Sequence, residues 1–140
     1  MKQITLVKNT FLALLVALML FSCSSCATQK PFLISSVVPA ARGTIQVKQD
    51  KNSNYVINIQ LSNLAEPERL QPPKKTYVVW MVTANNTTRN IGQIKPSNGA
   101  LKASFQTISS SKPTKVFITA EDDATIQFWS SPIVLTTEEL

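Results

Sequence analysis

Three short segments carry residue types that could do chemistry, and one of them has the spacing of a catalytic pair. Ser109 and Lys112 stand as Ser-x-x-Lys, in which a lysine one helical turn from a serine activates it for acyl transfer. Pro113 follows directly, and the sequence contains neither of the Ser-Asp-Asn and Lys-Thr-Gly motifs that accompany this chemistry. We therefore interpret the match as part of a loop between strands.

Two acidic segments have the residue types of a cation site and of a sugar-cleaving site. Glu121, Asp122 and Asp123 offer hard oxygens of the kind that calcium prefers, but such a site needs about six oxygens. Glu66 and Glu68 have the types of a glycosidase carboxylate pair, in a proline-containing segment without an aromatic platform for sugar. We expect an acidic turn at the first segment, a solvated loop at the second, and no metal ion.

The chain contains no histidine, which excludes histidine triads, cysteine–histidine pairs and imidazole metal sites. Its basic clusters, Lys74-Lys75 and the pair Lys112 and Lys115, are small and lack the interleaved aromatic residues of a nucleic-acid surface. The sequence thus predicts no catalytic residue, no cofactor and no nucleic-acid partner.

Residues 1–22 have the features of an export signal peptide. Lys2 and Lys8 give a positively charged start, and residues 11–21 form an unbroken apolar run. That run is shorter than the roughly 20 residues that a membrane-spanning helix needs, and polar residues follow it directly. We therefore leave residues 1–22 out of the expected fold.

The residues that end this segment are Leu20-Phe21-Ser22-Cys23, with an aliphatic residue three positions before the cysteine and a small residue directly before it. They resemble the lipobox of bacterial lipoproteins. The resemblance implies cleavage before Cys23, a diacylglycerol on its sulfur and an acylated amino terminus, and several acyl chains hold a protein stably on a bilayer. Cys26 is the alternative attachment site, and a secreted protein with a Cys23–Cys26 pair is the alternative to an anchor. Ser24, where an acidic residue would retain an enteric lipoprotein in the inner membrane, favours the outer membrane on its periplasmic or surface face.

After a polar tether at residues 23–31, apolar and polar residues alternate with a period of two, which is typical of strands with one buried face. Residues 76–83 are apolar on both faces and predict a central strand. Turn-forming residues separate the segments at 50–54, 85–88 and 97–99. We expect strands near residues 43–48, 55–62, 76–83, 90–94, 101–105, 116–120, 126–128 and 133–135, with 32–38 as a possible first strand.

Short strands at this spacing predict one all-β domain, residues 32–140, with an immunoglobulin-like two-sheet sandwich of seven to nine strands. Trp80 in the central strand is expected to be the core tryptophan of such a fold. Because both cysteines precede this domain, core burial alone must stabilise it.

Residues 70–82 contain Tyr77 and Trp80 in a Tyr-x-x-Trp strand, residues 90–94 form an Asn-Ile-Gly-x-Ile strand, and a Ser-Pro-Ile-Val-Leu segment comes last. Together these motifs resemble the extracytoplasmic domain of anti-sigma-K-type factors, over roughly residues 40–137. The resemblance implies a sandwich that contacts a protein or ligand, and no catalytic residue. Sigma-factor binding is not implied, because in that family it belongs to a cytoplasmic segment that a signal peptide replaces here.

We expect a lipid-anchored protein of the cell envelope that binds a protein or ligand in a sensory or accessory role and catalyses nothing. Its partners would be the membrane, through the N-terminal lipid, and an envelope protein. The alternative is a structural surface or filament subunit that assembles through strand edges.

Overall fold

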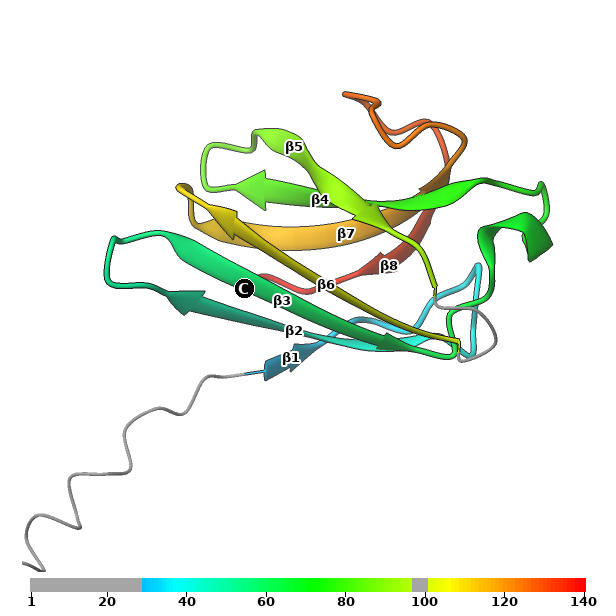
Figure 1. Ribbon diagram of the computed structural model, residues 1–140, viewed down its shortest axis with the longest axis horizontal. Coiled ribbons are helices and arrows are strands. Elements are labelled where there is room, and N and C mark those ends of the chain that lie inside the picture. Colours follow the sequence, from blue (N-terminus) through cyan, green and yellow to red (C-terminus); the bar gives the residue numbers. More distant parts are fainter. Residues whose placement is uncertain (1–28, 97–100) are drawn as a thin grey trace, which may run out of the picture.

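The computed structural model describes residues 29–96 and 101–140, which form two four-stranded antiparallel sheets packed face to face (Figure 1). The predicted signal peptide, Cys23, Cys26 and the turn at 97–99 lie outside the described residues. A single turn of 3-10 helix, η1 (Pro67–Arg69), joins the third strand to the fourth. The strands are β1 (Gln29–Pro31), β2 (Arg42–Gln49), β3 (Tyr55–Ser62), β4 (Thr76–Thr83), β5 (Thr88–Ile94), β6 (Lys102–Ser109), β7 (Pro113–Glu121) and β8 (Ile133–Thr136).

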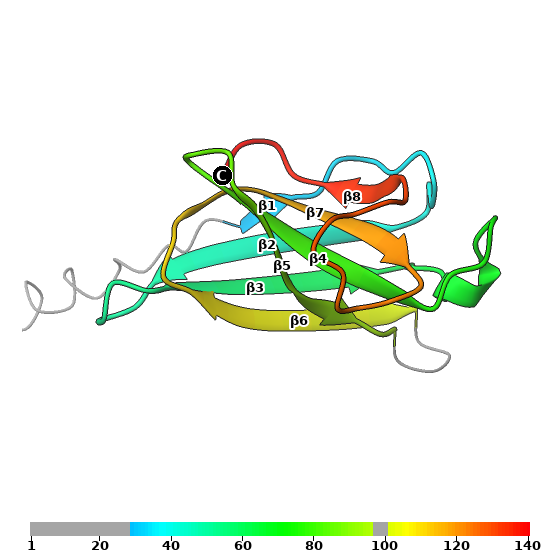
Figure 2. The ribbon, with the colours of Figure 1, turned by 90° about the horizontal axis from the view of Figure 1, so that it is seen from above.

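The strand order is β1-β2-β3-β6 in the first sheet and β5-β4-β7-β8 in the second. The chain therefore crosses between sheets after β3, β5 and β6, and Figure 2 shows the two layers from above. This arrangement confirms the prediction of an all-β, two-sheet sandwich, and β4 lies between two neighbours as expected for a central strand.

The core lies between the sheets and follows the alternation in the sequence. Ile57, Ile59 and Leu61 of β3 point inward, and Tyr77 and Val79 of β4 face them from the second sheet. Burial of each aliphatic side chain contributes about 1.5–3 kcal/mol. The one polar atom on these five side chains is satisfied, because the Tyr77 hydroxyl donates a hydrogen bond of 2.8 Å to the carbonyl oxygen of Ala65.

The strand expected at residues 32–38 is wrong. The first strand, β1, comes directly before this segment. The residues of β1 were predicted to be the end of the tether, but they pair with β2. Residues 32–41 instead cross toward the second sheet, where the Leu33 N–H donates to the Thr136 carbonyl oxygen of β8 at 2.8 Å. Phe32 and Val38 are buried in the core, and the Ser35 hydroxyl accepts the Val38 N–H. The apolar residues here thus cover one side of the sandwich without forming a ladder.

The strand β5 contains a bulge opposite the junction of Val79 and Trp80 in β4. Gly92 follows the unpaired residue with a φ of 142°, a conformation that side chains disfavour. A Cβ at this position would lie 2.7 Å from the ring of Phe105 in β6. Glycine is therefore required both by the backbone and by the close approach of the two edge strands.

Candidate functional site

A second apolar cluster lies on the outer face of the β5-β4-β7-β8 sheet. It contains Val78 and Trp80 of β4 and Phe117 of β7, with Ile126 packed against them. Trp80 is completely buried, but on the face opposite to Tyr77 and the inter-sheet core. Trp80 is therefore buried, as expected of a core tryptophan, but it lies in this outer cluster and not between the sheets, because β4 is apolar on both faces and the indole points outward.

The loop that joins β7 to β8, residues 122–132, covers this cluster. The ring of Trp129 stands edge-on against Trp80, with centroids 5.9 Å apart, and against Phe117, with centroids 5.1 Å apart. Trp80 and Phe117 stack nearly parallel at 6.2 Å. Both geometries are favourable for aromatic pairs and add about 0.5–1.5 kcal/mol per pair beyond simple burial. This part of the loop is consequently held in place by its aromatic packing.

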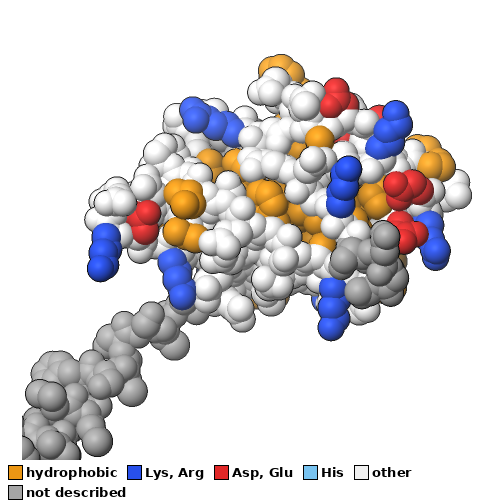
Figure 3. Space-filling model, viewed as in Figure 1, with side chains coloured by type: hydrophobic (Ala, Val, Ile, Leu, Met, Phe, Trp, Pro, Cys, Tyr) orange, Lys and Arg blue, Asp and Glu red, His pale blue; other side chains and the backbone are white. Residues whose placement is uncertain are grey.

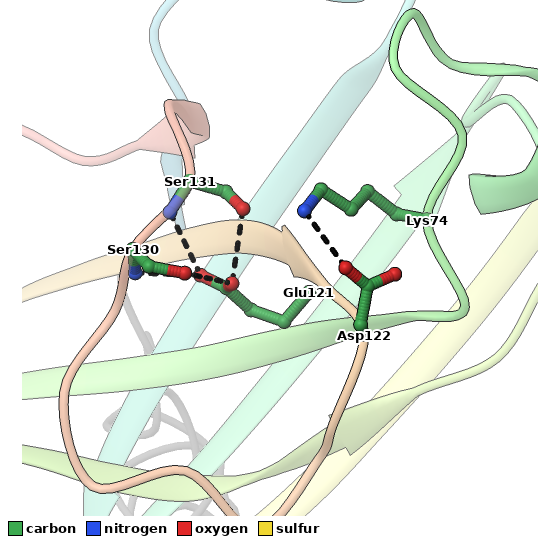
Figure 4. A network of polar contacts seen from close by, with 5 residues as sticks. All are labelled: Lys74, Glu121, Asp122, Ser130 and Ser131. Carbon is green, nitrogen blue, oxygen red and sulfur yellow. Dashed lines mark hydrogen bonds and ion pairs between the residues drawn. The ribbon is translucent and has the colours of Figure 1, made fainter.

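The carboxylate of Glu121, the last residue of β7, fixes the far end of the same loop (Figure 4). It accepts hydrogen bonds from the hydroxyl groups of Ser131 at 2.9 Å and Ser130 at 3.1 Å, and from both of their backbone N–H groups at 3.3 Å. On the strand side it is hydrogen-bonded to the hydroxyl of Thr119, which also accepts the indole N–H of Trp80 at 2.9 Å. One buried carboxylate thus links the loop to the aromatic cluster.

These contacts decide the charge of Glu121. Burial by itself raises the pKa of the carboxyl group, but the hydrogen bonds from Thr119, Ser131 and Ser130 outweigh burial and hold the pKa below its usual value. The group is therefore ionised at neutral pH although its side chain is only 2% exposed. An ionised carboxylate has no proton to donate, so both of its oxygens can accept the four hydrogen bonds from the loop.

The first half of the loop is fastened separately. The side-chain amide of Asn90 in β5 donates to the carbonyl oxygens of Ala124 at 2.8 Å and Ile126 at 2.9 Å. Lys74 forms an ion pair with Asp122, with a nitrogen–oxygen distance of 3.0 Å. Figure 4 shows this pair on one side of the end of β7, and Ser130 and Ser131 on the other. Residues 126–128, expected as a strand, are not one: the carbonyl oxygen of Ile126 bonds to the Asn90 side chain instead of to a neighbouring strand.

Although it is fastened, the loop exposes apolar side chains to solvent. Phe128 is 83% exposed, Trp129 is 43% exposed and Ile133, the first residue of β8, is 40% exposed. A hollow of about 220 Å³ lies at the end of the loop, and its lining includes Ser131, Pro132 and Val134 but none of these three exposed residues. We call Phe128, Trp129 and Ile133 the loop face. Functional residues commonly lie on loops that a rigid scaffold positions in this way.

The catalytic pair weighed in the sequence is not on a helix. Ser109 ends β6 and Lys112 precedes β7, on either side of a tight turn. The Ser109 hydroxyl donates to the carbonyl oxygen of Ser111 at 2.9 Å and accepts its N–H at 3.0 Å. This serine stabilises the turn and is not placed for activation by Lys112.

The acidic candidates also have structural partners. Glu66 forms an ion pair of 3.0 Å with Arg69 around η1, and Glu68 is exposed. Asp123 accepts the N–H and the hydroxyl of Thr125, which lower its pKa together with nearby Lys75. Among the described residues, no three acidic or cysteine side chains gather closely enough to hold a metal ion.

Sequence reasoning missed the residues that build the loop. Asn90 and Ser131 appeared only as members of the motifs that carry the family resemblance, Ser130 was not singled out, and Phe128 was taken as a strand position. The available indication was local: the apolar pair Phe128-Trp129 stands directly before two serines and a proline, which are turn-forming residues.

Comparison of the chain with models of protein families, with curated proteins and with solved structures finds no match. In the described part of the chain, no helix has the length and apolar character needed to cross a membrane. The resemblance to the outer domain of anti-sigma-K-type factors stays a prediction, and the function must be argued from the site itself.

Proposed function

We propose that the protein is a non-catalytic binding module of the cell envelope. It is anchored through acylated Cys23 and binds a protein partner with its loop face. The observation that carries this proposal is the exposure of Phe128, at 83%, on a loop that buried contacts hold rigid. Aromatic residues, phenylalanine included, are enriched at the centre of protein interfaces relative to the rest of the surface. A loop that is already ordered loses less conformational entropy when a partner binds.

The test is a crosslinking pull-down from intact cells, with two matched variants. Phe128→Ser removes the most exposed side chain of the loop face, and Ile108→Ser removes a 63% exposed side chain from β6. We expect Phe128→Ser to abolish capture of a specific envelope protein and Ile108→Ser to leave it unchanged. Equal capture by the native protein and Phe128→Ser would refute the loop face as the binding site.

Anchorage at the membrane is tested independently. Mass spectrometry of the mature amino terminus should find Cys23 with a diacylglyceryl group and an N-acyl chain, and Cys26 unmodified. An unmodified Cys23 would refute the anchor without affecting the loop face. The outer membrane, favoured by Ser24, is tested by fractionating the membranes.

One observation favours the structural alternative. The strand β6 stands at the end of its sheet, pairs with β3 over all eight residues without a register shift, and carries a single charged residue, Lys102. Long regular edge strands can add a strand from another chain. In that case Ile108→Ser, and not Phe128→Ser, would change the concentration-dependent oligomers that the protein forms in detergent.

A further inference from the structure

One end of the sandwich lies on the side from which the described chain begins. The first described residue, Gln29, pairs with Gln46 in the half of β2 that leads to the β2–β3 turn. The β2–β3 turn, residues 50–54, and the β6–β7 turn, residues 110–112, project at the same end (Figures 1 and 2). We call this the tether end.

At the tether end basic side chains outnumber acidic ones, six to three. Three acidic residues share this end, and the carboxylate of one of them, Asp50, is occupied by the N–H groups of Asn52 and Asn54 in the β2–β3 turn. Neither of the two ion pairs among the described residues involves a base of this end. Its six basic residues are Lys30, Lys48, Lys51, Arg89, Lys112 and Lys115, and its other two acidic residues are Glu138 and Glu139.

The opposite end mixes the two signs of charge instead. Lys75 and Lys95 line one hollow together with Glu66 and Glu68. The space-filling view shows the acidic side chains of this face gathered mostly away from the tether end (Figure 3). Both ion pairs of the described residues lie there, with nitrogen–oxygen distances of 3.0 Å: Arg69–Glu66 and Lys74–Asp122.

A pocket of about 210 Å³ opens at the tether end between two of its bases. Its lining includes the apolar side chains of Ile45, Val47 and Pro113, with Lys30 and Lys112 among the same lining residues. The Lys30 ammonium donates to the carbonyl oxygen of Glu139 at 2.6 Å, which keeps it at this position. A pocket with apolar walls and lysines at its edge can bind a ligand that has an anionic group attached to an apolar chain. Phospholipids have this chemistry.

The length of the tether limits how far this end can lie from a bilayer. Cys23 and Gln29 are six residues apart, and an extended chain spans at most about 3.6 Å per residue. Resting on the proposed acylation of Cys23, we infer that the tether end docks on a membrane surface of anionic phospholipids, with its six bases around the headgroup phosphates. The loop face is then held away from the docked surface.

The experiment maps lysine accessibility on the acylated protein. The protein is reconstituted in vesicles of phosphatidylcholine, or of phosphatidylcholine mixed equally with phosphatidylglycerol, and the reductive methylation of each lysine is measured by mass spectrometry. We expect Lys48, Lys51 and Lys112 to be about fivefold less methylated on the anionic vesicles, and Lys75 and Lys95 to react equally on both. High salt should remove the difference, because salt screens exposed charges.

Two variants with the same change in charge sharpen the test. In Lys51→Gln/Lys112→Gln, protection of Lys48 on anionic vesicles should fall to the level seen on phosphatidylcholine. In Lys75→Gln/Lys95→Gln, it should stay as in the native protein. Equal methylation of both lysine sets on both vesicles, with Cys23 acylated, would overturn the docking and leave the anchor intact. If Cys23 carries no lipid, the anchor fails, and selective co-sedimentation of that protein with the anionic vesicles decides the docking alone.

Discussion

The two apolar clusters of the sandwich are built differently, and the difference separates stability from recognition. The inter-sheet core is made of alternating aliphatic residues and Tyr77, and its members are almost all inaccessible. The outer cluster is small and aromatic. Its cover, the β7–β8 loop, is held by a few separate contacts: the carboxylate of Glu121, the amide of Asn90, the Lys74–Asp122 ion pair and the ring of Trp129. Loss of the inter-sheet core should unfold the domain. Loss of the contacts that cover the outer cluster should instead release the β7–β8 loop from a domain that stays folded.

The largest expected effect is in the inter-sheet core. Ile59→Ala removes a completely buried side chain of a central position in β3, and should lower the free energy of unfolding by about 3 kcal/mol. Denaturant titration followed by circular dichroism measures the change. Tryptophan fluorescence should report the same midpoint; an earlier transition of the tryptophan signal would show that the outer cluster does not depend on the core.

The second effect is at the carboxylate that holds the loop. Glu121→Gln replaces one carboxylate oxygen, a hydrogen-bond acceptor, with an amide NH2 group, which would then face the N–H and O–H donors of the loop. The change should lower the free energy of unfolding by about 2 kcal/mol. Hydrogen exchange should accelerate most at Ser130 and Ser131, and little at Ile59. Glu138→Gln, which changes an exposed acid, is the matched control. Uniform acceleration across both sheets would contradict a local role for Glu121.

The same residue gives the stability a defined pH dependence. Because the pKa of Glu121 is lower in the folded protein than its ordinary value of 4.5, the unfolded chain binds the proton more tightly. Its contribution is therefore complete above that ordinary value and is lost as the pH falls through the lowered folded value. The difference in stability between the native protein and Glu121→Gln should shrink over this acidic range.

The smallest effect distinguishes two neighbours in the loop. Trp129→Ala removes a partly buried ring that packs on Trp80, and should lower the free energy of unfolding by about 1 kcal/mol. Phe128→Ala should change it by less than about 0.5 kcal/mol, because that ring is mostly in solvent. Comparable losses from the two variants would show that Phe128 is part of the cluster and not free for a partner.

The sequence allowed the strands to be predicted where a strand pattern ran long. Residues 55–62 alternate over eight positions, residues 76–83 are apolar on both faces, and both segments are strands with the expected bounds. Residues 126–128 offered only two apolar positions, which a loop satisfies equally well. Alternation also could not say which face of β4 lies inward, because Val78 and Trp80 are as apolar as Tyr77 and Val79.

The site was harder to predict because its contacts follow no local period. Ser130 and Ser131 reach back to Glu121 over nine and ten residues, and Asn90 reaches forward over more than thirty to Ala124. Only the folded sheet brings these side chains together. The acidic character of Glu121 was visible in the sequence, whereas its use as a hydrogen-bond acceptor for a loop depended on the tertiary structure.

Gly92 has a consequence for how the sandwich keeps water out. The ring of Phe105 fills the space where a side chain of residue 92 would lie, so β5 and β6 close the gap between the sheets along that side. The opposite side is shut by residues 32–41, which run over β8 with Phe32 and Val38 turned inward. One side of the core is thus closed by the close packing of Phe105 on Gly92, and the other by the segment of residues 32–41. A single added methyl group at position 92 would push β5 and β6 apart.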